Sequence, residues 1–164
     1  MKEKLDTLAE DLGRILTARG LMFATAESCT GGWIGKVVTD VLGASVWFDR
    51  GFITYSNQAK REMLGVAEAT LLNHGAVSAE VVAEMAAGAL RHSQAQVAVA
   101  VSGIAGPGGA SEEKPVGTVF LAWALWDQQP VVQRLQFAGD RAEIRHQAVR
   151  VALERLIELL QDHG

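Results

Sequence analysis

Two short segments hold the residues best able to do chemistry: Thr-Ala-Glu-Ser-Cys-Thr-Gly-Gly at 25–32 and Thr-Tyr-Ser-Asn-Gln-Ala-Lys at 54–60. In the first, Ser28 lies between an apolar run and a helical pattern, beside backbone N–H groups that have no partner within the helix. The second supplies Tyr55 and Lys60, and a lysine that desolvation keeps neutral can take a proton from a serine hydroxyl. Together the segments predict a Ser-Lys hydrolase in which Tyr55 assists.

Each of these residues also has a purely structural interpretation. Ser28 could cap the following helix, although Thr30 is a competing cap that would leave Ser28 free. Lys60 could be a solvated surface lysine, and Tyr55 a half-buried strand residue whose hydroxyl needs some partner. The combination of the two segments favours the catalytic interpretation.

The two neighbours of Ser28 raise further alternatives. Cys29 is a rival nucleophile because a helix N-terminus lowers the pKa of a thiol. A small buried apolar role is favoured for it, since no histidine has an obvious pairing motif with it. Glu27 could orient Lys60 or accept hydrogen bonds from backbone amides, and the sequence leaves both interpretations open.

A glycine-rich segment predicts a ligand site. The Val and Ala run at 96–102 is typical of a strand covered on both faces, and it leads into Gly-Ile-Ala-Gly-Pro-Gly-Gly at 103–109. Glycines allow backbone N–H groups to approach a phosphate, but no Gly-Lys-Ser/Thr marks a Walker loop. The candidate binding residues here are Ser102, Gly103, Gly106, Thr118 at the start of a later strand, and Arg141, which is either a phosphate clamp or a solvated arginine at a helix start.

The remaining pattern predicts the elements that position these residues. Apolar spacings of three and four predict helices, and β-branched or aromatic runs predict strands. We expect helices at about 3–19, 30–42, 58–64, 67–73, 79–92 and 141–161. We expect strands at about 21–26, 96–102, 117–126 and 130–137, and a bent strand or hairpin at 46–55. The order predicts one α/β domain over residues 1–164, a three-layer α/β/α sandwich with a mixed, mostly parallel sheet of about five strands.

Composition excludes several classes of protein. The 164 residues carry a net charge of −4 without clustered Lys and Arg, which argues against binding to nucleic acid or an anionic membrane. One cysteine and four scattered histidines provide no metal-ligand spacing. The charged N-terminus has no signal-peptide core, and no apolar stretch approaches the roughly 20 residues of a membrane span. We therefore expect a cytoplasmic protein with a small-molecule substrate and no metal.

Four motifs closely resemble those of the nicotinamide-nucleotide amidase family, also known as the C-terminal domain family of the competence/damage-inducible protein CinA. They are the segments at 25–32, 51–60, 102–107 and 114–119, and the likeness runs from about residue 5 to 160. The resemblance implies hydrolysis of nicotinamide mononucleotide to nicotinate mononucleotide and ammonia, in pyridine-nucleotide recycling and without a cofactor. It also implies a homo-oligomer, with a dimer favoured, and a stand-alone form that lacks the extra N-terminal domain of many relatives.

The resemblance assigns roles to residues of this chain. It implies Ser28 as nucleophile and Lys60 as base with Tyr55 assisting. We also expect Glu27, Cys29, Thr30 and Gly31 to bind the nucleotide substrate. We expect the amides that follow Ser28 to hold the oxyanion. Two alternatives stay open: a non-catalytic nucleotide-sensing or scaffold domain of the same fold, and a thiol-dependent enzyme that uses Cys29.

Overall fold

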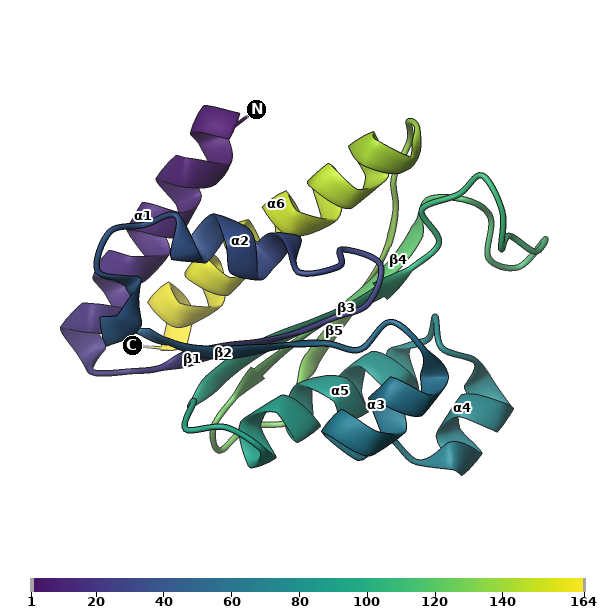
Figure 1. The fold of residues 1–164 in the computed structure, drawn as a ribbon, viewed down its shortest axis with the longest axis horizontal. Coiled ribbons are helices and arrows are strands. Elements are labelled where there is room, and N and C mark those ends of the chain that lie inside the picture. Colours follow the sequence, from purple (N-terminus) through teal and green to yellow (C-terminus); the bar gives the residue numbers. More distant parts are fainter. Residues whose placement is uncertain (1, 164) are drawn as a thin grey trace.

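The computed structural model describes residues 2–163, and within them a central sheet lies between two layers of helices (Figure 1). Five strands form this sheet in the order β2-β1-β3-β4-β5 over the described residues. The strands are β1 (Phe23–Glu27), β2 (Phe48–Ile53), β3 (Val97–Gly103), β4 (Thr118–Leu125) and β5 (Val131–Gln136). The helices are α1 (Lys2–Arg19), α2 (Trp33–Thr39), α3 (Asn57–Leu64), α4 (Glu68–His74), α5 (Ala79–Arg91) and α6 (Arg141–His163), with a short 3-10 helix at Ala44–Val46.

The sheet is mixed, as the sequence predicts. Strand β1 pairs in parallel with both β2 and β3, whereas β4 is antiparallel to β3 and to β5. Helices α1, α2 and α6 cover one face, and α3, α4 and α5 cover the other (Figure 1). The expected α/β/α architecture is therefore confirmed.

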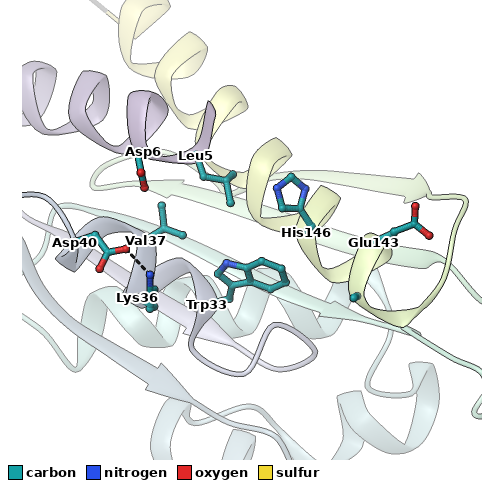
Figure 2. A pocket seen from close by; sticks show the side chains of 9 residues that line it. Leu5, Asp6, Trp33, Lys36, Val37, Asp40, Glu143 and His146 are labelled. Carbon is teal, nitrogen blue, oxygen red and sulfur yellow. Dashed lines mark hydrogen bonds and ion pairs between the residues drawn. The ribbon is translucent and has the colours of Figure 1, made fainter. Parts of the chain in front are cut away.

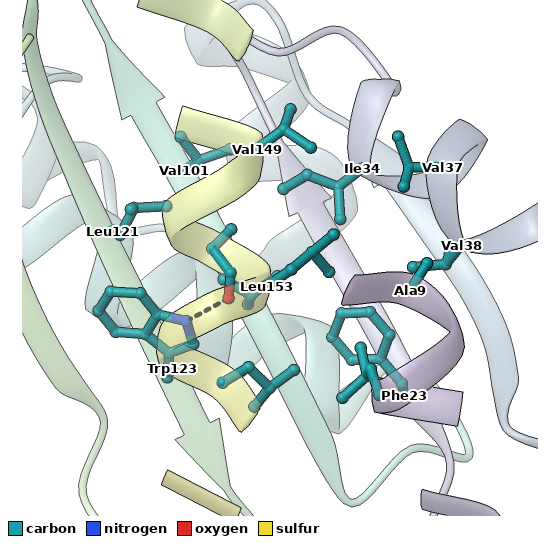
Figure 3. Packing of buried hydrophobic residues seen from close by; sticks show 14 of the residues in the cluster. Ala9, Phe23, Ile34, Val37, Val38, Val101, Leu121, Trp123, Val149 and Leu153 are labelled. Carbon is teal, nitrogen blue, oxygen red and sulfur yellow. Dashed lines mark hydrogen bonds between the residues drawn. The ribbon is translucent and has the colours of Figure 1, made fainter. Parts of the chain in front are cut away.

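The two faces of the central strands differ in side-chain size. Along β3 and β4 the larger side chains, among them Val99, Leu121 and Trp123, join the core beneath α1, α2 and α6. Figure 3 shows this core, in which the Trp123 indole donates a hydrogen bond to the Ala152 carbonyl at 2.9 Å. The opposite face is rich in alanine and packs against α5. Its alanines on these strands are Ala98, Ala100, Ala122 and Ala124.

A glycine in α5 allows α3 and α5 to pack closely. A Cβ at Gly88 of α5 would overlap the backbone carbonyl of Leu64 at the end of α3. Ser56 begins α3 by accepting a hydrogen bond from Ala59 N at 3.0 Å, and Gly65 ends it with a left-handed φ of 72°. Helix α3 is thus held at both ends, and it carries Lys60.

One expected helix is wrong in extent. The helix expected at 30–42 covers only Trp33–Thr39. It begins late because Gly31 and Gly32 both have positive φ values that a continuing helix cannot contain. Of the bent strand or hairpin expected at 46–55, the structure has the single strand β2, whose pairing register with β1 shifts between Phe48 and Arg50. The strand expected at 21–26 is β1, which extends to Glu27 and so ends directly before Ser28.

Candidate active site

Ser28 lies at the carboxyl end of the parallel part of the sheet. Its backbone N–H donates to the Val101 carbonyl of β3 at 3.0 Å, which continues the β1–β3 pairing by one residue. The residue is 7% exposed, so its side chain lies largely inside the protein. This edge of a parallel sheet is a usual place for a ligand to bind.

Lys60 approaches Ser28 from α3. Its Nζ lies 3.0 Å from Ser28 Oγ and donates to the carbonyl oxygens of Thr54 at 2.9 Å and Tyr55 at 3.2 Å. The side chain is 1% exposed, which is rare for a lysine. The structure therefore brings the two groups together within hydrogen-bonding distance.

The surroundings of Lys60 favour a neutral amine. Burial lowers the pKa of Lys60 from its ordinary value of 10.5, because the charged form loses its hydration. The opposing influence is a thiolate charge on Cys29, which is absent at neutral pH. A neutral amine has two N–H donors, and the carbonyls of Thr54 and Tyr55 can only accept. When Lys60 is neutral and donates both N–H groups to these carbonyls, its lone pair faces the Ser28 hydroxyl, as a general base requires.

Glu27 accepts hydrogen bonds from the start of α2. Its buried carboxylate receives the hydroxyl of Thr30 at 2.6 Å and the backbone N–H groups of Ile34 at 2.9 Å and Gly35 at 3.0 Å. The competing cap interpretation of Thr30 is therefore wrong: the cap residue is Gly32, and a side chain from the preceding strand satisfies the helix amides.

These hydrogen bonds reduce the number of backbone amides that could form the expected oxyanion hole. Beyond the Ile34 and Gly35 amides that Glu27 occupies, Gly31 N donates to the Ser28 carbonyl and Trp33 N to the Thr30 carbonyl. Helix α2 therefore directs its first amides to the protein rather than to a substrate. The amides of the turn next to Ser28, at Cys29 and Thr30, are the donors closest to it in the chain.

Cys29 has the character of a core residue. Its side chain belongs to the hydrophobic core beneath α1, α2 and α6, and burial raises the pKa of the thiol to about 12. A thiol with that pKa is almost entirely protonated near neutral pH and is a weak nucleophile. Arg145 of α6 fixes the turn by donating to the carbonyls of Cys29 at 2.9 Å and Thr30 at 3.2 Å.

A cavity of about 260 Å³ opens in front of Ser28 and Lys60. Of the residues expected from the sequence, it is lined by Ser28, Cys29, Tyr55, Lys60, Ser102, Gly103 and Arg141. Tyr55 is 64% exposed, so it lies at the mouth rather than between Ser28 and Lys60. Arg141 donates to the Tyr55 hydroxyl at 3.3 Å and to the Gly106 carbonyl at 2.9 Å.

Other expected binding residues lie outside the lining of this cavity. The Thr118 hydroxyl donates to the Pro115 carbonyl and is paired with the Gln136 side chain, so the expectation that it faces the cavity is wrong. Gly106 contributes through its carbonyl contact with Arg141. Glu27 is the last residue of β1, and Thr30 and Gly31 belong to the turn between Ser28 and α2; these three residues are not part of the cavity lining.

Sequence reasoning missed four residues that line the cavity. Asn57, Ala76, Val77 and Ala105 also line it. Asn57 is the first residue of α3, and its place directly after the Ser56 cap was the one available signal. Ala76 and Val77 come from the connection between α4 and α5, where no residue type points to chemistry.

Within residues 2–163, no cluster of three or more His, Cys, Asp and Glu side chains could hold a metal ion. In the same part of the chain, no helix combines the length and apolar character that crossing a membrane requires.

The fold and the cavity define an α/β/α protein whose candidate nucleophile is a serine and whose candidate base is a buried lysine. Residues 5–160 match the model of the CinA C-terminal domain, and the chain belongs to this family. The finding confirms the family that the four sequence motifs resemble.

Individual relatives are similar over nearly their whole length. The Escherichia coli (strain K12) protein named nicotinamide-nucleotide amidohydrolase PncC is 56% identical over 153 residues, which are 93% of each chain. The Pseudomonas putida protein of the same name is 49% identical over 96% of this chain and 98% of its own. The crystal structure of competence/damage inducible protein CihA from Agrobacterium tumefaciens has a TM-score of 0.93 at 49% identity and covers 95% of both chains.

Proposed function

We propose that this chain is an amidohydrolase that converts nicotinamide mononucleotide to nicotinate mononucleotide and ammonia, with Ser28 as nucleophile and Lys60 as general base. The observation that carries the mechanism is the 3.0 Å separation of Ser28 Oγ and buried Lys60 Nζ. The names of the relatives from Escherichia coli and Pseudomonas putida support the choice of substrate.

Acylation uses Lys60 first as a base and then as an acid. Lys60 takes the hydroxyl proton while Ser28 Oγ forms a bond to the carboxamide carbon, giving a tetrahedral oxyanion. The protonated Lys60 then gives this proton to the amide nitrogen as the C–N bond breaks. Ammonia leaves, and the nicotinoyl group stays on Ser28 as an ester.

Deacylation repeats the sequence with water. Lys60 accepts a proton from water as the water oxygen attacks the ester carbon, and it returns the proton to Ser28 Oγ when the ester bond breaks. The product is nicotinate mononucleotide, and both residues regain their initial states. No step requires a redox change.

Arg141 supplies the positive charge at the cavity. Its guanidinium lies between Tyr55 and the glycine loop, where it can pair with the phosphate of the nucleotide while the carboxamide reaches Ser28. Gly103 of the same loop lines the cavity and allows the ligand to approach the backbone. Binding energy from the phosphate would position the carboxamide carbon for attack.

We also propose that the protein acts in the cytoplasm. A phosphorylated nucleotide is a cytoplasmic substrate, because its charge prevents unaided passage through a membrane. We also propose a homo-oligomer, with a dimer favoured. The apolar side chains of Leu42 and Val46 are strongly exposed near the α2 end, and burial of such side chains stabilises association. Sedimentation of the wild type beside Leu42→Ser tests this assembly.

The decisive experiment measures ammonia release from nicotinamide, its riboside and its mononucleotide. We expect the mononucleotide to have by far the highest kcat/KM and Ser28→Ala to abolish turnover while the protein still binds it. Lys60→Arg should also be inactive, since a guanidinium stays protonated. Binding of the mononucleotide without ammonia release by the wild type would instead indicate a sensing or scaffold domain. Activity in Ser28→Ala combined with inactivity in Cys29→Ala would identify a thiol enzyme.

A further inference from the structure

A second cavity, larger than the one in front of Ser28, lies between α1, α2 and α6. Its volume is about 460 Å³, which falls within the range of small-molecule sites. Figure 2 shows Leu5 of α1, Trp33 and Val37 of α2, and His146 of α6 around a common space. The cavity therefore has the apolar and aromatic walls that bind the body of a ligand.

His146 is a buried polar group in the lining of this cavity. It is 8% exposed, and its ring lies edge-on to the Trp33 indole with 5.7 Å between ring centroids. Its Nε2 is buried and has no hydrogen-bond partner among residues 2–163. A buried polar atom without a partner is uncommon and calls for an explanation, such as a ligand that completes its surroundings.

One end of the cavity is acidic. Asp6 and Asp40 lie together there, whereas Glu143 is at the opposite end (Figure 2). An adjoining hollow of about 290 Å³ adds Glu10, so three carboxylates face one cation, Lys36. Lys36 is already bound to Asp40 at 2.6 Å, and the same two aspartates raise its pKa. This end therefore attracts a positive group.

A positive charge already lies against Trp33, outside the residues that line the cavity. The Arg145 guanidinium lies 5.5 Å from the centre of the Trp33 ring and is also bound to the turn after Ser28. A second cation beside Trp33 would be repelled by it. An incoming ligand is thus oriented, with its aromatic or apolar body near Trp33 and His146 and its charge near Asp6 and Asp40.

We propose that the α1–α2–α6 cavity is a second ligand site, separate from the catalytic cavity, which takes a small organic cation with an aromatic body. The two cavities have no lining residue in common. The inference rests on the cavity walls and their charge, and it does not depend on which reaction occurs at Ser28.

Tryptamine is a suitable probe because it joins an indole to an ammonium group. The reporter is the side-chain N–H signal of Trp33 in a two-dimensional NMR spectrum, assigned with Trp33→Phe. We expect a saturable shift of this signal. N-acetyltryptamine, the neutral analogue, should bind at least about tenfold more weakly, since it lacks the charge that the acidic end attracts.

Variants separate this site from general charge effects. Asp6→Asn combined with Asp40→Asn should weaken tryptamine binding at least about tenfold, whereas Asp162→Asn, at the far end of α6, should not. Ala142→Phe places a ring at the exposed rim of the cavity and should block binding. Urea unfolding of each variant establishes that it is folded.

Three results would overturn the proposal. The first is the absence of a saturable Trp33 shift with tryptamine, and the second is equal binding of the neutral analogue or of the Asp6/Asp40 double variant. The third is a Trp33 signal that changes with protein concentration alone, together with a dimer mass in sedimentation. That result would mean that a second copy of the chain fills the cavity.

Discussion

Replacement of Lys60 by methionine would test both the proposed chemistry and the cost of burying the amine. Methionine is an unbranched side chain of similar length, so it can occupy the same space without a proton-accepting group. The loss of the general base should lower kcat/KM by about 10²–10⁴-fold. Because Lys60 is 1% exposed, the change should also alter how stability depends on pH.

The expected size of this pH effect follows from the titration of a single proton on Lys60. The pKa of Lys60 is lowered by burial in the folded protein and has its ordinary value of 10.5 when unfolded. Between these two values the unfolded chain binds one more proton than the folded chain, so the free energy of unfolding rises with pH by up to about 1.4 kcal/mol per unit. The destabilisation is complete below the folded-state pKa and disappears above the unfolded-state pKa.

Urea unfolding of the wild type and Lys60→Met between about pH 7 and 10 measures this effect. The wild-type minus variant difference in unfolding free energy should increase with pH at the stated slope. Lys36→Met is the control: the pKa of Lys36 is raised, so both of its states hold the proton over this range and its difference should stay flat. Equal pH dependence in the wild type and Lys60→Met would refute the neutral buried amine.

Three further outcomes are expected. With a thiol pKa of about 12, roughly one Cys29 in 10⁴ is a thiolate at pH 8. Treatment with a thiol-alkylating reagent should therefore modify Cys29 little, as measured by mass spectrometry, and activity should persist. Rapid inactivation by the reagent would count against this. Glu27→Gln should lower the unfolding free energy by about 2 kcal/mol in urea, because an amide cannot replace the carboxylate as acceptor for both amides of α2; an unchanged midpoint would contradict that role. Gly88→Ala should push α3 away at Leu64, which should lower the unfolding free energy by about 2 kcal/mol and also lower kcat. Gly108→Ala is the control, because a Cβ there meets open space. Equal stability and kcat in the two variants would show that this close packing is unimportant.

The order of helices and strands was predictable because most elements have strong apolar periodicity. The buried strand at Val97–Gly103 and the long helix Arg141–His163 follow directly from the spacing of Val, Ala and Leu. The extent of α2 was not predictable in the same way. Its apolar stripe continues to Val41, but the left-handed conformations of Gly31 and Gly32 delay its start.

The candidate site was predictable where residue types carry chemistry. Ser28, Lys60 and Arg141 could be selected from the sequence, and the structure places all three at one cavity. Long-range geometry decided the rest. Glu27 accepts hydrogen bonds from two amides of α2 because the chain reverses direction within seven or eight residues. Val77 lines the cavity because of how α4 and α5 pack against the sheet.

The unequal size of the side chains on the two sheet faces has a consequence for how the protein responds to random substitutions. On the α5 face, an added methyl group at Gly88 would overlap the Leu64 carbonyl and force the backbone to move. On the opposite face, larger residues such as Trp123 and Leu121 can be trimmed, and each loss costs stability while helices partly settle into the space. Substitutions that enlarge Gly88 should therefore displace α3 and with it Lys60, whereas substitutions that shorten side chains on the other face should mainly lower stability.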